Sequence, residues 1–480
     1  MVSETPGGSV VLAGGRSASE ILYGALDDAV RTCATPSKSF SLPNKGQVFK
    51  RAYPDILPVF EAARLGSTQR LEMARHIVDT LRRELVWQWG SEAMPVAGVL
   101  RDAAEPLALE VKDFGAGQGW TPELTDRGTI WKADSLALVG EVLCGRQVIT
   151  SAAAEALAWI SKHLLEQGRV HLGGRRIAML GAGAEMAPTR AWLQAGADVL
   201  WLDAAPPPQA WFDSGDLKGR LYTPSLPVDL LSRPQEVLAT LLAFSNGEPL
   251  DLGLYAYAPG KAREIRLTAV MNALVEAMPC DLVRSVTLLV SPTTPTAIGE
   301  DDVATMQTRR HTRPAWETIL SGLGLLSRQN GCVETSSGAV SRTVIGIQGA
   351  SYQAAQYVGK ILTAECWYQD SIASGESGPR ISANTAAITR TRSLEHPVFT
   401  AAFAGASAFG VETLEPEQSR CLNGLLALHD WFHPEPPVPG RIRVHGGIHT
   451  LPYPLESALQ VAAAIGFARR PKLFRGLLSR

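Results

Sequence analysis

The chain has 480 residues, of which 45% are hydrophobic, so it is long enough for two or three domains with a large core. Its formal net charge of −2 lacks the basic excess that is typical of nucleic-acid-binding proteins. None of the six cysteines forms a C-x-x-C pair, which excludes a disulfide framework and favours a reduced, cytoplasmic protein. No uncharged apolar run reaches about 18 residues, so we expect no membrane span.

Residues 1–170 carry no recognisable chemistry, and we expect them to form an accessory domain that is α/β or mostly helical. Apolar residues at helical spacing predict amphipathic helices over 68–87 and 149–168. In the second helix, Ser151 is the expected N-cap and Gly168 the expected stop. Such a domain would either cover a functional site or mediate assembly into a homo-oligomer, and the sequence leaves both roles open.

From residue 171 onward, short apolar strands alternate with helices. We expect strands within 176–180, 197–203, 251–260, 284–296 and 379–389, and helices within 187–196, 233–244, 262–278, 313–326 and 351–369. This alternation predicts an α/β fold with a Rossmann-type doubly wound parallel sheet over 171–432. Residues 433–480 are expected to form a C-terminal extension with a Pro-rich loop and a closing helix.

A glycine turn, "GAGAEMA", joins the first of these strands to its helix. In a dinucleotide-binding turn the first glycine makes the tight turn and the second lets the backbone approach the pyrophosphate. Gly181 and Gly183 occupy these places and Ala184 follows them. Asp203 ends the next strand, where an acid accepts hydrogen bonds from the adenosine ribose and repels a 2′-phosphate. The turn therefore predicts an NAD(H) site, with NADP(H) less favoured; the alternative is a glycine turn that binds nothing.

Three further segments resemble the short-chain dehydrogenase/reductase superfamily, and to a lesser degree the ketoacyl-reductase domains of fatty acid synthases. They are "LYAYAPG" (254–260), "VTLLVSPTTPT" (286–296) and "RISANTAAITRT" (380–391). The resemblance implies that Ala258 and Pro259 contact the cofactor. It also implies that Ser291 is the catalytic serine, and that Asn384 and Thr389 lie near the nicotinamide.

The same family uses a Y-x-x-x-K pair as its proton donor and its ammonium partner. Counted from Tyr352, the lysine position holds Gln356, and the next lysine is Lys360. Tyr352 and Tyr357 are both candidates for the acid, because either could share a helix face with Lys360. Such a tyrosine would protonate the oxyanion left by hydride transfer, and a nearby ammonium would lower its pKa. The alternative is that both tyrosines are interior aromatics.

Two H-x-x-x-H pairs, His429 with His433 and His445 with His449, lie close together in the sequence. Only the first is expected on a helix, where the two imidazoles could share a metal; no metal site is predicted.

The sequence thus predicts an NAD(P)(H)-dependent oxidoreductase acting on a carbonyl or activated C=C bond of a small or acyl-type substrate. The alternative is a catalytically degenerate Rossmann protein that serves as a nucleotide-binding scaffold or as a partner in an assembly.

Overall fold

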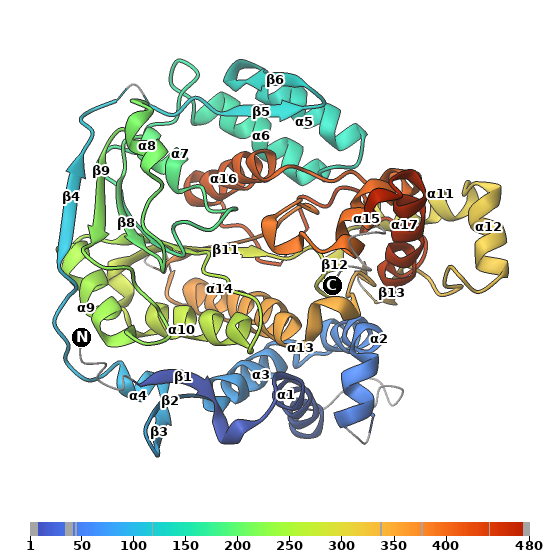
Figure 1. Cartoon of the computed structure of the whole chain (residues 1–480), viewed down its shortest axis with the longest axis horizontal. Coiled ribbons are helices and arrows are strands. Elements are labelled where there is room, and N and C mark those ends of the chain that lie inside the picture. Colours follow the sequence, from blue (N-terminus) through green and yellow to red (C-terminus); the bar gives the residue numbers. More distant parts are fainter. Residues whose placement is uncertain are drawn as a thin grey trace.

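The computed structural model describes residues 8–33, 42–43, 46–117, 119–336, 338–375, 378–440 and 442–473. Its centre is a seven-stranded sheet in the order β15-β11-β10-β7-β8-β9-β4 (Figure 1). Six strands are parallel: β7 (Arg176–Leu180), β8 (Asp198–Leu202), β9 (Arg220–Pro224), β10 (Leu250–Leu254), β11 (Val283–Val290) and β15 (Arg380–Thr385). The seventh, β4 (Leu109–Asp113), pairs antiparallel with β9 at one edge. The chain is therefore an α/β protein with a mostly parallel sheet.

Helices bury both faces of the sheet. Because side chains alternate along a strand, each strand contributes residues to two hydrophobic cores. In β7, Ala178 and Leu180 join one hydrophobic core, and Ile177 and Met179 join the other. The first core includes α9 (Pro234–Ser245), α10 (Arg263–Ala277) and α14 (Thr363–Ala373). The second includes α7 (Thr189–Gln194) and α16 (Pro416–Phe432). Figure 1 shows these two helical layers on opposite sides of the strands.

Residues of the first third of the chain cover both faces. The helices α1 (Ala18–Thr32), α2 (Gly46–Leu65) and α3 (Arg70–Glu84) extend the first core, beyond α10 and α14 (Figure 1). On the other face, α5 (Leu136–Gly145) and α6 (Ser151–His163) pack on the side of α16. This segment also holds the small sheet β1-β2-β3, built from Ser9–Leu12, Leu85–Trp89 and Glu92–Pro95, and the hairpin of β5 (Glu123–Asp126) and β6 (Thr129–Lys132). The division at residues 170 and 432 remains a prediction.

The strand after β8 was not expected, and neither was the edge strand β4. The N-cap of α6 is Thr150, whose side chain accepts a hydrogen bond from the Ala153 N–H, so the choice of Ser151 was wrong. That helix ends at His163, and Gly168 lies in a later turn with a φ of 76°. The helix expected over 187–196 is shorter, because Pro188 precedes its first residue, Thr189.

The helix expected over 351–369 is one continuous rod made of three pieces. They are α13 (Gly349–Gln353), the π-helix η5 (Ala354–Leu362) and α14. Every residue of η5 is buried. A π-helical stretch inside an α-helix is a rare feature that is frequent at functional sites.

The insertion between β11 and α13 forms a small sheet of β12 (Ala297–Ile298), β13 (Cys332–Thr335) and β14 (Gly338–Ser341), together with α11 (Glu300–His311) and α12 (Ala315–Gly322). Beside it, α15 (Pro397–Gly405) and α17 (Leu455–Arg469) pack on each other and share a third core (Figure 1). The closing helix was predicted within the C-terminal extension, whose last residues, 474–480, lie outside the described part of the chain. No helix among the described residues combines the length and apolarity needed to cross a bilayer.

Candidate active site

A pocket of about 530 Å³ opens at the carboxyl ends of the parallel strands. Its walls come from the loops that follow β7, β10, β11 and β15, from the helical rod of α13 and η5, and from α15 and α17. The carboxyl edge of an open parallel sheet is where α/β proteins usually bind ligands. Of the expected site residues, the pocket is lined by Ala184, Pro259, Ser291, Tyr352, Lys360 and Thr389.

The polar floor of this pocket is a chain of hydrogen-bonded side chains. Tyr352 is hydrogen-bonded to Ser291, the first residue after β11. The Ser291 and Thr293 hydroxyls are 2.8 Å apart, and the Thr293 hydroxyl donates to Gln348 Oε1 at 2.6 Å.

Gln356, at the position where the family has its lysine, also faces this floor. Its Oε1 accepts a hydrogen bond from the Ser291 N–H at 2.9 Å, and the side chain is buried. Gln356 therefore fixes the backbone of Ser291 and carries no charge. Lys360 lies one helical turn further along η5, and its ammonium donates to the Leu289 carbonyl at 2.6 Å.

Burial favours the neutral form of both Lys360 and Tyr352, so it shifts their pKa values in opposite directions. It lowers the pKa of Lys360 to about 8, since the ammonium is desolvated. It raises the pKa of Tyr352 to about 12, an effect that Glu264 adds to and the hydrogen bond from Ser291 opposes. The expectation that a neighbouring ammonium would lower the tyrosine pKa was therefore wrong. Tyr352 is a neutral phenol at pH 7, which is the form that donates a proton.

Tyr357 lies on the other side of the π-helix and takes no part in the pocket. Its hydroxyl donates to Glu61 of α2, inside a fully buried cluster. There the Arg64 guanidinium binds Glu61 at 2.7 Å and Glu365 at 2.8 Å. Of the two tyrosines that the sequence left open, only Tyr352 lines the pocket and contacts Ser291.

Two more side chains of the pocket were missed or set aside. Tyr257, in the loop after β10, lies edge-on to Tyr352 with ring centroids 6.1 Å apart. Glu264, in the first turn of α10, accepts from the Ser351 hydroxyl at 2.8 Å and from the Gly260 N–H at 3.1 Å. Acids in a loop-to-helix turn are common N-terminal caps, so nothing in the sequence separated Glu264 from an ordinary capping residue.

The glycine turn lies at one end of the pocket. Gly181 has a φ of 87°, and a Cβ there would lie 2.2 Å from the Ala256 nitrogen, so only glycine fits. The Gly183 N–H donates to Asp203 Oδ2 at 2.9 Å, and the other oxygen of Asp203 accepts from the Ala205 N–H. Gly181, Gly183 and Asp203 thus stand together, in the arrangement that the adenosine half of a dinucleotide requires.

Two features of the turn depart from that arrangement. The helix whose N-terminus usually faces the pyrophosphate begins only at Thr189 and has six residues. Glu185 also places a carboxylate at the turn, where it accepts from the Arg392 N–H at 3.0 Å and lies 3.8 Å from the Arg392 guanidinium. Gly181, Gly183 and Asp203 fit a dinucleotide by residue type and position. The phosphates would have to be held by the backbone of the turn and by Arg392.

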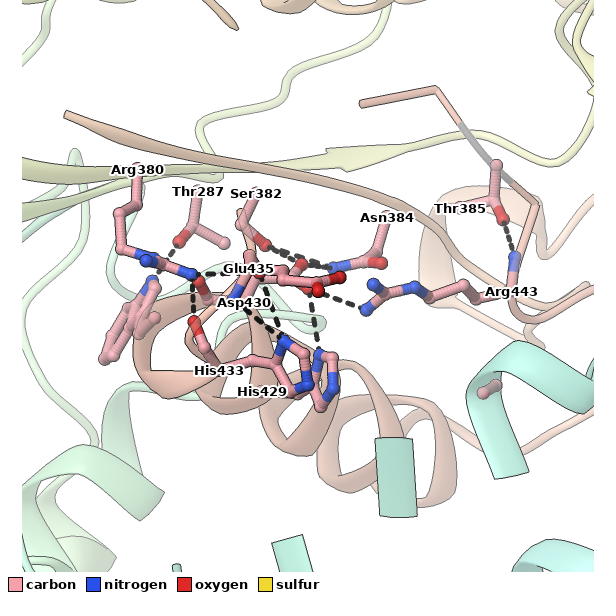
Figure 2. Close-up of polar contacts among 12 residues, drawn as sticks. Thr287, Arg380, Ser382, Asn384, Thr385, His429, Asp430, His433, Glu435 and Arg443 are labelled. Atoms are coloured by element: carbon pink, nitrogen blue, oxygen red, sulfur yellow. Dashed lines mark hydrogen bonds and ion pairs between the residues drawn. The ribbon is translucent and has the colours of Figure 1, made fainter. Parts of the chain in front are cut away.

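Asn384 does not reach the pocket. Its amide donates to Asp430 Oδ2 at 2.7 Å, on the face of the sheet covered by α16 (Figure 2). Asp430 also accepts from Ser382 and from Arg443, both at 2.7 Å. Although burial opposes it, Arg443 and these hydrogen bonds lower the pKa of Asp430. The role expected of Asn384 at the nicotinamide thus has no support in its position. Ala258 packs against the first core beside Pro259.

The histidine pairs lie in two places. His429 and His433 stack on each other with ring centroids 4.6 Å apart and surround Trp159 (His429 and His433 are drawn in Figure 2). His445 and His449 are buried near α11, where His445 Nε2 lies 3.7 Å from Asp302. Within the described ranges, no group of three or more His, Cys, Asp or Glu residues is placed to hold a metal ion.

No protein-family model matches this chain, and no curated protein matches it significantly in sequence. The site is therefore interpreted from its own geometry.

Proposed function

We propose that this chain is an NAD(H)-dependent oxidoreductase of the Rossmann type that transfers hydride to or from a carbonyl or an activated C=C bond. The observation that carries the proposal is the pair of Ser291 and Tyr352, hydrogen-bonded in the same pocket that the glycine turn borders. The strand order supports it as well. Numbered along the chain, the six parallel strands run 3-2-1-4-5-6 from β9 to β15, the order of doubly wound dinucleotide-binding sheets.

In this proposal Tyr352 and Ser291 receive the oxygen of the substrate carbonyl. Bound NADH would supply the hydride. The Tyr352 hydroxyl donates its proton to the oxyanion that develops, and Ser291 stabilises the same oxygen by a hydrogen bond. Gln356 accepts from the Ser291 N–H and Gln348 accepts from the Thr293 hydroxyl, so the two glutamines hold Ser291 and Thr293 in place.

Asp203 is the residue proposed to select NAD(H). A carboxylate at the end of β8 accepts hydrogen bonds from ribose hydroxyls and repels a 2′-phosphate. Ribose binding would require Asp203 to exchange its contact with the Gly183 N–H for the ligand hydroxyls. A Cβ on Gly183 would lie 3.1 Å from the Trp201 ring, so ligand binding beside this glycine is expected to change the fluorescence of Trp201.

The test is a fluorescence titration with NADH and with NADPH, on the wild type, Gly183→Val and Tyr357→Phe. Saturable NADH binding that Gly183→Val removes and Tyr357→Phe retains is the expected result, because the valine side chain would collide with Trp201 and Asp203 at the turn. Thermal unfolding of each variant separates loss of the site from loss of the fold. Absence of binding for both nucleotides in the wild type would refute the proposal.

A second candidate function is favoured by three contacts. The Gly183 N–H is already occupied by Asp203, the lysine position holds Gln356, and the Lys360 ammonium is tied to a main-chain carbonyl. A degenerate protein that binds a ligand in this pocket without redox chemistry would have these features. It predicts ligand binding without any nucleotide, and no turnover with carbonyl substrates in the presence of NADH.

A further inference from the structure

The part of the pocket remote from the glycine turn is an apolar chamber, and α15 and α17 together form one of its walls. Each of these helices turns one face toward it, at the i, i+3, i+4, i+7 spacing of a single helical stripe. From α15 and the residue after it come Phe399, Ala402, Phe403 and Ala406. From α17 come Leu455, Ala458, Leu459 and Ala462.

The two helices contact each other through small residues, of which Ala462 also lines the chamber. A Cβ on Gly405 would lie 1.9 Å from the Ala462 carbonyl oxygen, and a Cβ on Gly466 would lie 1.8 Å from that of Ala401. The backbones therefore touch at these points. Because their mutual contact needs no large side chain, the larger apolar residues of both helices remain available to line the chamber.

Charge is confined to the other end of the same pocket. Its charged lining residues are Glu185, Glu264, Lys360 and Arg392. Glu185 and Arg392 lie at the glycine turn, Lys360 is bonded beside the floor, and Glu264 caps the loop beside Tyr352. The pocket thus has a hydrogen-bonding end at Ser291 and Tyr352 and an apolar end that α15 and α17 line.

We propose that the chamber binds the aliphatic chain of a carbonyl compound whose oxygen lies at Ser291 and Tyr352. This inference rests on the proposed function for the assignment of the polar end, and it names the substrate class: ketones or acyl compounds with an extended apolar chain. Alanine alternates with larger apolar side chains on the pocket-facing stripe of both helices, so an aliphatic chain would lie alongside the helix pair. The volume of the whole pocket lies within the range of ligand sites for small organic molecules.

The test is calorimetric titration with 2-butanone, 2-hexanone, 2-octanone and 2-decanone in the absence of any nucleotide. Each added methylene buried in the chamber should tighten binding about fourfold, until the chamber is full. Ser291→Ala should weaken the whole series by a similar factor of about three to ten, because it removes one hydrogen bond at the shared polar end.

Variants of α17 test whether the aliphatic chain of the ligand lies in the chamber. Ala458→Phe, which fills the chamber, should weaken 2-octanone at least about tenfold and leave 2-butanone nearly unchanged. Ala464→Phe places the same side chain on the exposed face of α17 and should change neither. Should Ala458→Phe fail to fold, Leu459→Gln makes the same test, because it introduces an amide into the chamber wall.

Affinity that does not depend on chain length would overturn the inference, and so would tighter binding of acetophenone than of 2-octanone. Because these titrations contain no nucleotide, their outcome is separate from that of the NADH titration. Chain-length-dependent binding without NADH binding would retain the chamber and refute the oxidoreductase. NADH binding without chain-length dependence would do the reverse.

Discussion

At the scale of single residues, the two tyrosines of the π-helical rod show how position decides a role. Tyr352, which is half-buried at the pocket, and Tyr357, which is fully buried, lie five positions apart. One is bonded to a serine in a pocket, and the other to a carboxylate in a closed ionic cluster. Their spacing from Lys360 does not separate them as candidates, whereas their surroundings and hydrogen-bond partners do.

Replacement of these tyrosines by phenylalanine should have opposite effects. Tyr352→Phe removes the proton donor, so kcat for carbonyl reduction should fall about 10²- to 10⁴-fold with little change in melting temperature. Tyr357→Phe leaves Glu61 short of a donor and should lower stability by about 1–3 kcal/mol with kcat retained. Steady-state kinetics and thermal unfolding on both variants make the comparison. A Tyr352→Phe enzyme with wild-type kcat would contradict the assignment.

The two glycines of the turn offer a matched pair for stability. Gly181→Ala combines a positive φ with a backbone collision, so we expect a loss of about 3 kcal/mol or more. Gly183→Ala meets only Trp201 at 3.1 Å and Asp203 at 3.4 Å and should lose about 1 kcal/mol. Chemical denaturation measures both values. Equal losses would mean that the turn adjusts more freely than its geometry indicates.

Asp302 predicts a pH dependence of stability. Burial, with the neighbouring Asp301, raises its pKa to about 6. A carboxyl whose folded pKa lies above its unfolded pKa contributes stability at pH 3–4, and that contribution is lost as the pH rises to 6. Asp302→Asn should therefore be more stable than wild type at pH 7, by about 2–3 kcal/mol, and the difference should vanish near pH 4. Glu300→Gln, at an exposed acid in the same helical turn, is the control in thermal unfolding across this range.

At the scale of elements, the sequence predicted the strands and helices that repeat the βαβ pattern. The strand at Arg176–Leu180 was expected with these bounds, because its apolar residues end at a glycine turn. The strand β9, "RLYTP", was missed because it has only two apolar residues and ends with proline. The chamber walls α15 and α17 were not recognised as part of the site, since alanine-rich apolar stripes read equally well as core.

The contact between α15 and α17 should tolerate no added atom on its small residues. Gly466→Ala would drive a methyl group into the Ala401 carbonyl and should destabilise the fold by about 1–3 kcal/mol. Ala464→Leu, on the exposed side of the same helix, should stay within about 0.5 kcal/mol of wild type. Denaturation midpoints of the two variants test this. A neutral Gly466→Ala would mean that the two helices are less closely packed.

At the scale of the whole molecule, the candidate site was predictable only in outline. Ser291, Tyr352 and the glycine turn were named from their order along the chain, and the structure brings them to one pocket. Asn384 was misplaced, since a strand position does not reveal which face its side chain takes when both faces are buried. Gln356 was noticed as a missing lysine, but its bond to the Ser291 N–H depends on tertiary contact alone.

The coverage of both sheet faces predicts that the chain does not divide at residue 170. A fragment of residues 171–480 would lack β4 and would expose both cores where α2, α3, α5 and α6 now pack. We expect it to aggregate or to bind the dye ANS strongly, unlike the full chain. A soluble, cooperatively unfolding fragment would instead establish an independent domain.

The pairing of β4 with β9 also has a consequence for synthesis on the ribosome. Leu109 pairs with Pro224 and Asp113 with Arg220, so β4 leaves the exit tunnel more than a hundred residues before its partner. The helices α1, α2 and α3 are likewise synthesised before the strands that share their hydrophobic core. Pairings of such long sequence separation are slow to form, and the apolar surfaces that await them are exposed meanwhile. We therefore expect the nascent chain to need chaperones, and a translational pause before β9 to lengthen the exposure of its apolar surfaces.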